Sequence, residues 1–155
     1  MTRIAICGAN GKMGKNVFAC ADEREDCTVI AGIDIYTKQY ADFPIVETPA
    51  QLPEKPDVII DFSNPASLDG LLDYCLSTGT PLVIASTGYS DEQIQQIKDA
   101  SAQIPVFFTF NMSLGINLLV NLAKKAAAVL GDRFDIEIVE KHHNQKIDAP
   151  SGTAI

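Results

Sequence analysis

Residues 3–14, with the sequence RIAICGANGKMG, decide the fold that we expect for this chain. The first five form a largely apolar run that ends at Cys7, which predicts a buried β-strand. Glycines follow at positions 8, 11 and 14, and apolar residues at helical spacing continue from Met13 to Ala21. A tight turn that lies against a pyrophosphate needs glycine, because a Cβ atom would block the approach. The segment therefore predicts a dinucleotide-binding turn.

The glycine spacing alone leaves two interpretations open. The pattern GxxGxxG differs from GxGxxG, so an ordinary glycine turn is the alternative. A second strand, predicted over residues 28–34, ends in Asp34 about 20 residues after the last glycine, where dinucleotide-binding folds place a carboxylate that accepts hydrogen bonds from ribose hydroxyls. This carboxylate favours NADH, because it would repel the 2′-phosphate of NADPH. Ile35 in place of arginine agrees with NADH, whereas Lys38 is close enough in sequence to keep NADPH open.

Strand and helix patterns alternate along the rest of this region. Apolar runs predict three further strands, over residues 58–62, 82–85 and 106–109. Helices are predicted after Ser63 and after Ser90, which begins the capping box SDEQ, and the proline-rich residues 36–56 are predicted as a loop. Near-continuous apolar strands that alternate with helices predict an α/β fold, a Rossmann-type parallel sheet with helices on both faces.

Ligands bind such sheets past the carboxyl ends of the strands, where the strand order switches. Short polar segments directly follow the predicted strands, at residues 62–63, 86–88 and 111–112. Each of them alone could be an ordinary surface turn. Their shared position predicts that they lie on the same edge as the glycine turn and Asp34.

The pattern changes at Ser113, where we predict a second domain. Residues 114–129 carry one apolar and one polar stripe, which predicts an amphipathic helix, and Gly131 is placed to end it. Near-alternating apolar residues over 134–139 predict a half-buried strand. We therefore expect a dinucleotide-binding domain over residues 1–112 and the incomplete beginning of an α+β domain over residues 113–155.

Residues 140–154, EKHHNQKIDAPSGTA, hold the densest chemistry in the chain. They contain two adjacent histidines, two lysines, two carboxylates and a turn of small residues, within a protein of formal net charge −8. This local basic island could hold a small anion, and an imidazole can donate a proton near neutral pH. Paired histidines can also bind a metal, but no third ligand is evident at a suitable spacing, so no metal is predicted. An exposed basic loop without function is the remaining alternative.

Composition argues against several classes of protein. A hydrophobic fraction of 46% and a charged fraction of 21% are typical of a globular domain with a sizeable core. The pI of about 4.6 argues against a nucleic-acid partner. No apolar run approaches about 18 residues and the chain begins with a strand pattern, so neither a membrane span nor secretion is expected. The four cysteines lack metal-like spacing and are expected to be buried, reduced thiols of a cytoplasmic protein.

Residues 140–154 resemble the signature of the dihydrodipicolinate reductase (4-hydroxy-tetrahydrodipicolinate reductase) family. The family pattern, roughly E-x-H-H-x-x-K-x-D-A-P-S-G-T-A, is met at every defined position. The glycine turn and the segments at 61–63, 86–88 and 111–113 match the nucleotide-binding side of the family, so the resemblance covers the whole chain. It implies an enzyme of lysine and diaminopimelate biosynthesis that reduces 4-hydroxy-tetrahydrodipicolinate, a small dicarboxylate, with NADH or NADPH.

The resemblance also implies roles for individual residues. Contacts to the cofactor are expected from Gly8, Ala9, Asn10, Gly11, Lys12, Met13, Asp34, Ala85, Ser86, Thr87, Thr109, Phe110, Asn111 and Met112. His142 would be the proton donor and Lys146 a second acid. The substrate carboxylates would be held by His143, Lys146, Gly152 and Thr153. Ala85 departs from the family, in which many members have glycine, and its methyl group could alter how the backbone approaches the cofactor.

The resemblance further implies a longer protein. Members of the family continue well past the signature, and the remainder completes a mixed-sheet substrate domain that builds a homotetramer. We therefore expect this chain to be a fragment that binds nucleotide and need not turn over by itself. Two other classes stay open: a nucleotide-sensing module that binds NADH but not pyridine-2,6-dicarboxylate, and a different Rossmann oxidoreductase that acts on a sugar or a semialdehyde.

Overall fold

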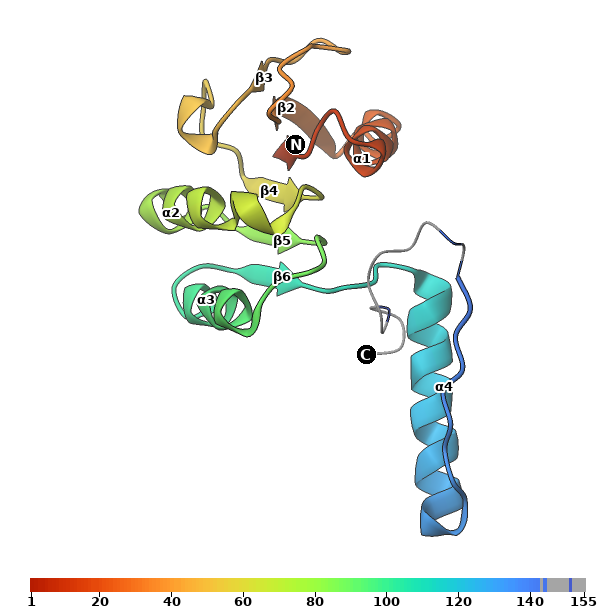
Figure 1. Ribbon diagram of the computed structural model, residues 1–155. Coiled ribbons are helices and arrows are strands. Elements are labelled where there is room, and N and C mark those ends of the chain that lie inside the picture. Colours follow the sequence, from red (N-terminus) through yellow and green to blue (C-terminus); the bar gives the residue numbers. More distant parts are fainter. Residues whose placement is uncertain (143, 145–150, 152–155) are drawn as a thin grey trace. The chain divides into compact units, whose positions relative to one another are not determined.

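A computed structural model of the chain describes residues 1–142, 144 and 151. The chain divides into two compact units, Met1–Phe108 and Thr109–Ile155. Figure 1 shows the sheet with its helices in the first unit and one long helix in the second.

The first unit is built on a parallel sheet of six strands in the order β3-β2-β1-β4-β5-β6. The strands are β1 (Thr2–Cys7), β2 (Cys27–Ile33), β3 (Ile45–Val46), β4 (Val58–Asp61), β5 (Leu82–Ile84) and β6 (Val106–Phe108). The chain builds outward from β1 to β3, then crosses back to place β4 on the other side of β1. The gap between the ends of β1 and β4 is therefore the switch point of the strand order.

Helices cover both faces of this sheet, as predicted. They are α1 (Lys12–Asp22), α2 (Leu68–Thr78) and α3 (Asp91–Ser101). Alternate residues of β1 point to opposite faces: Ile4 and Ile6 pack with α1, whereas Ala5 and Cys7 pack with the buried residues of α2 and α3. The Rossmann-type α/β fold is confirmed.

Local signals place several element ends correctly. The Ser90 hydroxyl accepts from the backbone N–H of Gln93, and the Gln93 side chain accepts from the Ser90 N–H, which forms the predicted capping box. Residues 36–56 are less loop-like than predicted, because Ile45–Val46 pairs with Gly32–Ile33 as the edge strand β3 and Pro49–Gln51 forms a 3₁₀ turn. A two-residue strand is too short to show a periodicity in the sequence.

The cysteines differ in burial, which corrects the expectation that all four are buried. Cys7 and Cys75 are buried, Cys27 is partly buried and Cys20 is exposed; all four are free thiols. Cys20 and the buried Ala21 are neighbours in α1, but only Ala21 faces the core and Cys20 is exposed. A position within a helix is therefore not enough to predict burial.

The first helix of the second unit is α4 (Leu114–Leu130). The helix starts where the Ser113 hydroxyl accepts from the backbone N–H of Ile116 over 3.3 Å, and it ends at Gly131, whose φ is 62°. A 3₁₀ turn, Gly131–Arg133, follows. The predicted helix and its glycine stop are therefore present.

Residues 134–139, predicted as a half-buried strand, do not form one. The segment runs back along α4 without strand pairing, and Phe134, Ile136 and Ile138 are exposed (Figure 1). A strand needs a neighbouring backbone for its hydrogen bonds, and the described part of this unit contains no other strand. The apolar residues do alternate along this segment, but no strand among the described residues of this unit pairs with it.

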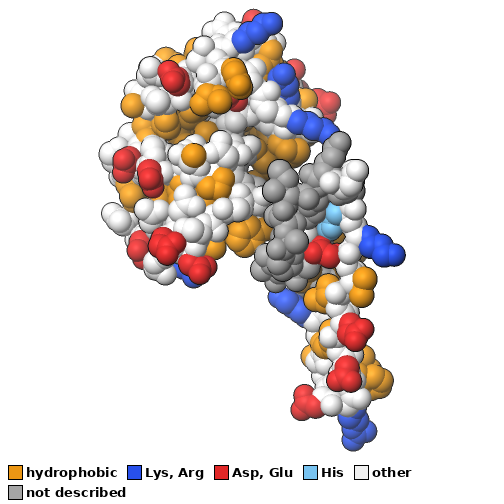
Figure 2. All heavy atoms as spheres, in the orientation of Figure 1, with side chains coloured by type: hydrophobic (Ala, Val, Ile, Leu, Met, Phe, Trp, Pro, Cys, Tyr) orange, Lys and Arg blue, Asp and Glu red, His pale blue; other side chains and the backbone are white. Residues whose placement is uncertain are grey.

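Hydrophobic side chains of α4 reach the surface of this unit (Figure 2). The segment Leu114–Arg133 is 20 residues long with a hydropathy of 1.3, enough to cross a membrane by length and composition alone. A single helix of this kind is a weak indication, and Lys124 and Lys125 lie near its middle. The absence of a membrane span stays a prediction.

Candidate functional site

The glycine turn between β1 and α1 is shaped by close backbone contacts. Gly8 has a φ of 76°, and a Cβ atom there would lie 2.7 Å from the carbonyl oxygen of Phe62. A Cβ atom on Gly14 would lie 2.2 Å from the carbonyl oxygen of Gly8. The N–H of Gly11 donates to that same oxygen over 3.0 Å and closes the turn. The glycines are thus required by the chain itself as well as by any ligand.

The start of α1 offers a place for an anion. Gly11 is the N-cap and has no side chain to accept hydrogen bonds from the first N–H groups of the helix. The positive end of the helix dipole lies at the same point. Because Gly8 and Gly11 carry no side chains, a phosphate can reach these groups directly. The cradle fits the pyrophosphate of a dinucleotide.

Asp34 lies at the carboxyl end of β2, beside this turn. Its Oδ2 accepts the backbone N–H of Asn10 over 2.9 Å, and its Oδ1 accepts the N–H of Tyr36 over 3.0 Å. The Asn10 side chain in turn donates to the carbonyl oxygens of Tyr36 and Lys38. The turn and the segment after β2 therefore form one hydrogen-bonded piece. A carboxylate has about four acceptor positions, which leaves Asp34 able to accept ribose hydroxyls.

A pocket of about 350 Å³ opens between these segments and the end of β4. Gly8, Gly11, Asp34, Tyr36 and Ser63 are among the residues that line it. It lies at the carboxyl ends of the strands and at the switch point between β1 and β4. This is the position at which open parallel sheets bind nucleotides.

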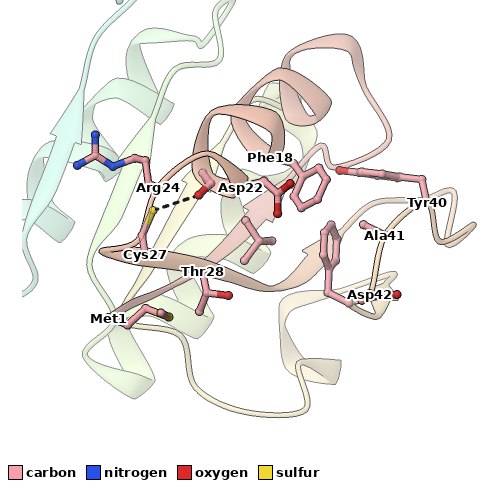
Figure 3. Close-up of a pocket in the computed structure, with 12 residues that line it drawn as sticks. Met1, Phe18, Asp22, Arg24, Cys27, Thr28, Tyr40, Ala41 and Asp42 are labelled. Atoms are coloured by element: carbon pink, nitrogen blue, oxygen red, sulfur yellow. Dashed lines mark hydrogen bonds between the residues drawn. The ribbon is translucent and has the colours of Figure 1, made fainter.

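A larger pocket, of about 600 Å³, lies at the opposite end of β2 (Figure 3). The last turn of α1, the first residues of β2 and residues 40–43 enclose it, and the rings of Phe18, Tyr40 and Phe43 pack edge to face on one side. Cys27 donates to the carbonyl oxygen of Ala21 over 3.8 Å. This pocket is at the amino end of β2, away from the edge that carries the predicted site residues.

In the second unit, Glu140 holds Ser151. The Glu140 carboxylate accepts the backbone N–H of Ser151 over 2.9 Å and also accepts the Ser151 hydroxyl. His142 lies with its Nδ1 3.5 Å from Oε2 of the same carboxylate. One carboxylate therefore contacts both the predicted proton donor, His142, and Ser151. His143, Lys146, Gly152 and Thr153 lie outside the described residues.

Two family models match this chain. One, described as dihydrodipicolinate reductase, N-terminus, matches residues 2–112; the other, dihydrodipicolinate reductase, C-terminus, matches residues 115–155.

The chain belongs to the dihydrodipicolinate reductase family.

Similar proteins agree with this assignment. The 4-hydroxy-tetrahydrodipicolinate reductase of Clostridium novyi is 44% identical over 155 residues, which is 100% of this chain and 62% of the relative. The enzyme of that name from Caldanaerobacter subterraneus is 48% identical over 100% of this chain and 61% of its own length. A solved dihydrodipicolinate reductase from Paenisporosarcina sp. TG-14, with dipicolinate bound, is 32% identical, with a TM-score of 0.78 over 99% of this chain and 63% of that chain. The chain thus spans about three-fifths of the length of these reductases.

The structure places most of the residues expected to bind cofactor along strand ends. Gly8 to Met13 form the turn and the start of α1, and Ala85, Ser86 and Thr87 directly follow β5. Ala85 is partly buried, Ser86 is buried and Thr87 is exposed. Thr109, Phe110, Asn111 and Met112 open the second unit, where the Thr109 hydroxyl accepts the backbone N–H of Asn111 over 3.3 Å.

Asp61 was expected only as part of the segment 61–63 on the nucleotide-binding side, without a role of its own, although this residue organises much of the edge. It is the last residue of β4 and is fully buried, and its carboxylate accepts hydrogen bonds from Ser63, Ser86 and Tyr89. The one signal in the sequence was an acidic residue inside the apolar run VIIDF. Its partners in space could not be read from that run.

Proposed function

We propose that this chain forms the nucleotide-binding and proton-donating part of an NADH- or NADPH-dependent enzyme that reduces 4-hydroxy-tetrahydrodipicolinate to tetrahydrodipicolinate in lysine and diaminopimelate biosynthesis. The observation that carries the proposal is the presence, in one chain, of a phosphate cradle at Gly8–Gly11 and the family's acid-bearing segment at residues 140–154. Membership in the reductase family supports the same activity.

The cofactor would lie along the carboxyl ends of the strands. Gly8 to Met13 would hold its pyrophosphate, and Ala85–Thr87 and Thr109–Met112 would flank the nicotinamide and its ribose. The bound nicotinamide supplies the hydride. Asp34 would accept the adenosine ribose hydroxyls and would disfavour a 2′-phosphate, so we propose a preference for NADH over NADPH.

The proposed reaction replaces a C–OH group by C–H, so it consumes one hydride and one proton and releases water. Once the hydroxyl has left as water, hydride addition to the conjugated imine leaves an electron pair that must be protonated. His142 would supply that proton, with Lys146 as a second acid. Because Nδ1 of His142 faces the Glu140 carboxylate at 3.5 Å, Nε2 is the ring nitrogen left to face a substrate.

The substrate is a dicarboxylate, and the proposed contacts suit it. His143 and Lys146 can carry positive charge, and backbone N–H groups at Gly152 and Thr153 can approach a planar carboxylate closely because Gly152 has no side chain. The solved relative from Paenisporosarcina is described with dipicolinate bound, a planar dicarboxylate. That description supports the same class of ligand here.

For the whole protein we propose a division of labour between domains. Residues 1–112 would bind the dinucleotide, and residues 113–155 would begin the domain that binds substrate and forms a homotetramer. We also propose a cytoplasmic location, in keeping with four free thiols and a biosynthetic reaction that uses a nicotinamide cofactor.

Binding of NADH, and then of dipicolinate to the NADH complex, tests this function against its alternatives. In the complete protein, NADH should bind, and dipicolinate should bind the NADH complex. A nucleotide-sensing module would bind NADH but remain indifferent to dipicolinate, and a sugar or semialdehyde oxidoreductase would oxidise NADH with those substrates instead. Absence of NADH binding would overturn the proposal as a whole.

A further inference from the structure

The carboxylate of Asp61 is the most deeply buried charge-bearing group on the nucleotide-binding edge. Its residue has 0% relative exposure and ends β4, where it stands in register with Cys7 of β1 and Ile84 of β5. Burial of a carboxylate is costly unless hydrogen bonds replace the lost water. A buried carboxylate at the end of β4 therefore needs hydrogen-bond donors around it.

Donors surround both carboxylate oxygens. Oδ1 accepts the backbone N–H of Ser63 over 3.0 Å and also the Ser63 hydroxyl. Oδ2 accepts the Ser86 hydroxyl over 2.8 Å and the Tyr89 hydroxyl over 3.2 Å. The four bonds use about all of the acceptor capacity of a carboxylate. They join the segment after β4 to the segment after β5.

The two segments held in this way continue into the site. The Ser63 hydroxyl also lies 2.6 Å from the Ser67 hydroxyl, and the Tyr89 ring packs edge to face on Phe108 at the end of β6. The carbonyl oxygen of Phe62, the residue after Asp61, lies 2.7 Å from where a Cβ atom on Gly8 would be. A shift at Asp61 would therefore reach the glycine turn as well as residues 85–87.

The Tyr89 hydroxyl and the Cys7 thiol, which lie near Asp61, stay protonated and can therefore donate hydrogen bonds. Burial, and second the charge of Asp61, raises the pKa of Tyr89, so its hydroxyl remains a donor across the physiological range. The same two causes raise the pKa of the Cys7 thiol to about 12. Asp61 is thus set among neutral donors, with no cation beside it in the hydrogen bonds described.

We propose that Asp61 is a positioning residue for the cofactor: its carboxylate fixes the segments after β4 and β5 in the shape that receives the nicotinamide half of the dinucleotide. The inference rests on the proposed dinucleotide function but adds a residue that acts through Ser63, Ser86 and Tyr89 rather than by touching the cofactor. A purely structural role is the competing explanation, because a buried carboxylate that loses its hydrogen-bond partners destabilises a fold whether or not a ligand binds.

The test is the dissociation constant of NADH in the complete protein, compared among four forms. The substitution Asp61→Asn keeps the shape but turns one acceptor into a donor that faces other donors. Tyr89→Phe removes a single donor from a residue outside the expected cofactor contacts. Thr80→Val is the matched control, because Thr80 is equally buried, shares a 2.7 Å hydroxyl contact with Thr78 and lies before β5, at its amino end.

Wild type should bind NADH. Asp61→Asn should bind it about tenfold more weakly or worse, and Tyr89→Phe about threefold more weakly. Each substitution removes a hydrogen bond to the carboxylate and so distorts the segments after β4 and β5. Thr80→Val should stay within about twofold of wild type even if its Tm falls. An Asp61→Asn affinity within twofold of wild type, or an equal loss in Thr80→Val, would overturn the inference. If Asp61→Asn does not fold, an unchanged affinity in Tyr89→Phe overturns it. Failure of wild type to bind NADH would instead contradict the proposed function.

Discussion

Glu140 and Ser151 stand eleven positions apart in sequence, yet the Glu140 carboxylate accepts both the backbone N–H of Ser151, over 2.9 Å, and its hydroxyl. The same carboxylate lies 3.5 Å from Nδ1 of His142. Charge-assisted bonds of this kind are stronger than neutral ones. Ser151, which directly precedes the residues expected to bind substrate, is therefore held by Glu140.

The substitution Glu140→Gln tests this attachment. The glutamine amide can accept the Ser151 N–H and donate to the Ser151 hydroxyl, but it lacks the charge that strengthens both bonds. We therefore expect dipicolinate to inhibit the complete enzyme about tenfold less strongly. NADH affinity should not change, because the pair lies outside the nucleotide-binding unit. Equal loss of NADH and dipicolinate binding would show that Glu140 supports the fold rather than the substrate turn.

The substitution Gly8→Ala should weaken nucleotide binding. A Cβ atom would lie 2.7 Å from the Phe62 carbonyl oxygen, and the φ of 76° is unfavourable for alanine. We expect a cost of roughly 1–3 kcal/mol in the free energy of unfolding and at least tenfold weaker NADH binding, measured by urea denaturation and nucleotide fluorescence.

Gly70→Ala is the matched control for that change. Gly70 is exposed within α2 and no atom lies within 4 Å of its added Cβ, so alanine should stabilise the protein by roughly 0.5–1 kcal/mol. NADH affinity should be unchanged. A Gly8→Ala protein that binds NADH as well as Gly70→Ala does would contradict the phosphate cradle.

The substitution Asp34→Asn should change the choice between cofactors. Asparagine retains an acceptor for the N–H groups of Asn10 or Tyr36 but loses the negative charge. We expect weaker NADH binding and a higher ratio of NADPH to NADH affinity, because the repulsion of a 2′-phosphate is removed. Titration of both nucleotides measures the ratio; a ratio equal to that of wild type would remove Asp34 from the selection of cofactor.

A pH-dependent contribution to stability is expected from Arg3 and Asp57, at the amino end of the sheet. Asp57 accepts the Arg3 backbone N–H over 2.8 Å, and Nη2 of Arg3 lies 3.0 Å from its other oxygen. The side-chain hydrogen bond from Arg3 holds the pKa of Asp57 below its ordinary value of 3.8. Because the folded pKa is depressed, the stabilisation is complete above 3.8 and is lost as the pH falls through the folded value.

Asp57→Asn should accordingly lower the Tm at neutral pH by a small amount, since both partners are well exposed to solvent. The difference between variant and wild type should shrink to near zero in strong acid. A Tm difference that persists unchanged at a pH well below 3.8 would show that the charge of Asp57 is not its cause.

The parts of the fold that could be predicted from sequence depend on neighbours in the chain. The strand before Gly8, the capping box at Ser90 and the stop at Gly131 are each specified within a few residues, and all are present. The two-residue strand Ile45–Val46 was missed because its only signal is the pairing with β2. The strand predicted over 134–139 failed for the complementary reason, since its local pattern has no partner among the described residues of that unit.

The same distinction applies to the site. The glycine turn and Asp34 were predicted from spacing, and the structure places them together. The cluster at Asp61 was not, because Ser86 and Tyr89 come from 25 and 28 positions away, and only the pairing of β4 with β5 brings them to it. The roles of His143 and Lys146 stay predictions from the family signature.

The most direct test of the proposed reductase is the oxidation of NADH by the complete protein upon addition of 4-hydroxy-tetrahydrodipicolinate, with wild type compared to His142→Ala. We predict oxidation that depends on this substrate, and a kcat lower by about 100-fold or more in the variant with an unchanged dissociation constant for NADH, because the proton donor is lost while the cradle is intact. Lys141→Ala, an exposed neighbour, should keep the wild-type rate. A wild-type protein that binds NADH without oxidising it in the presence of this substrate, or a His142→Ala variant with an undiminished rate, would contradict the account.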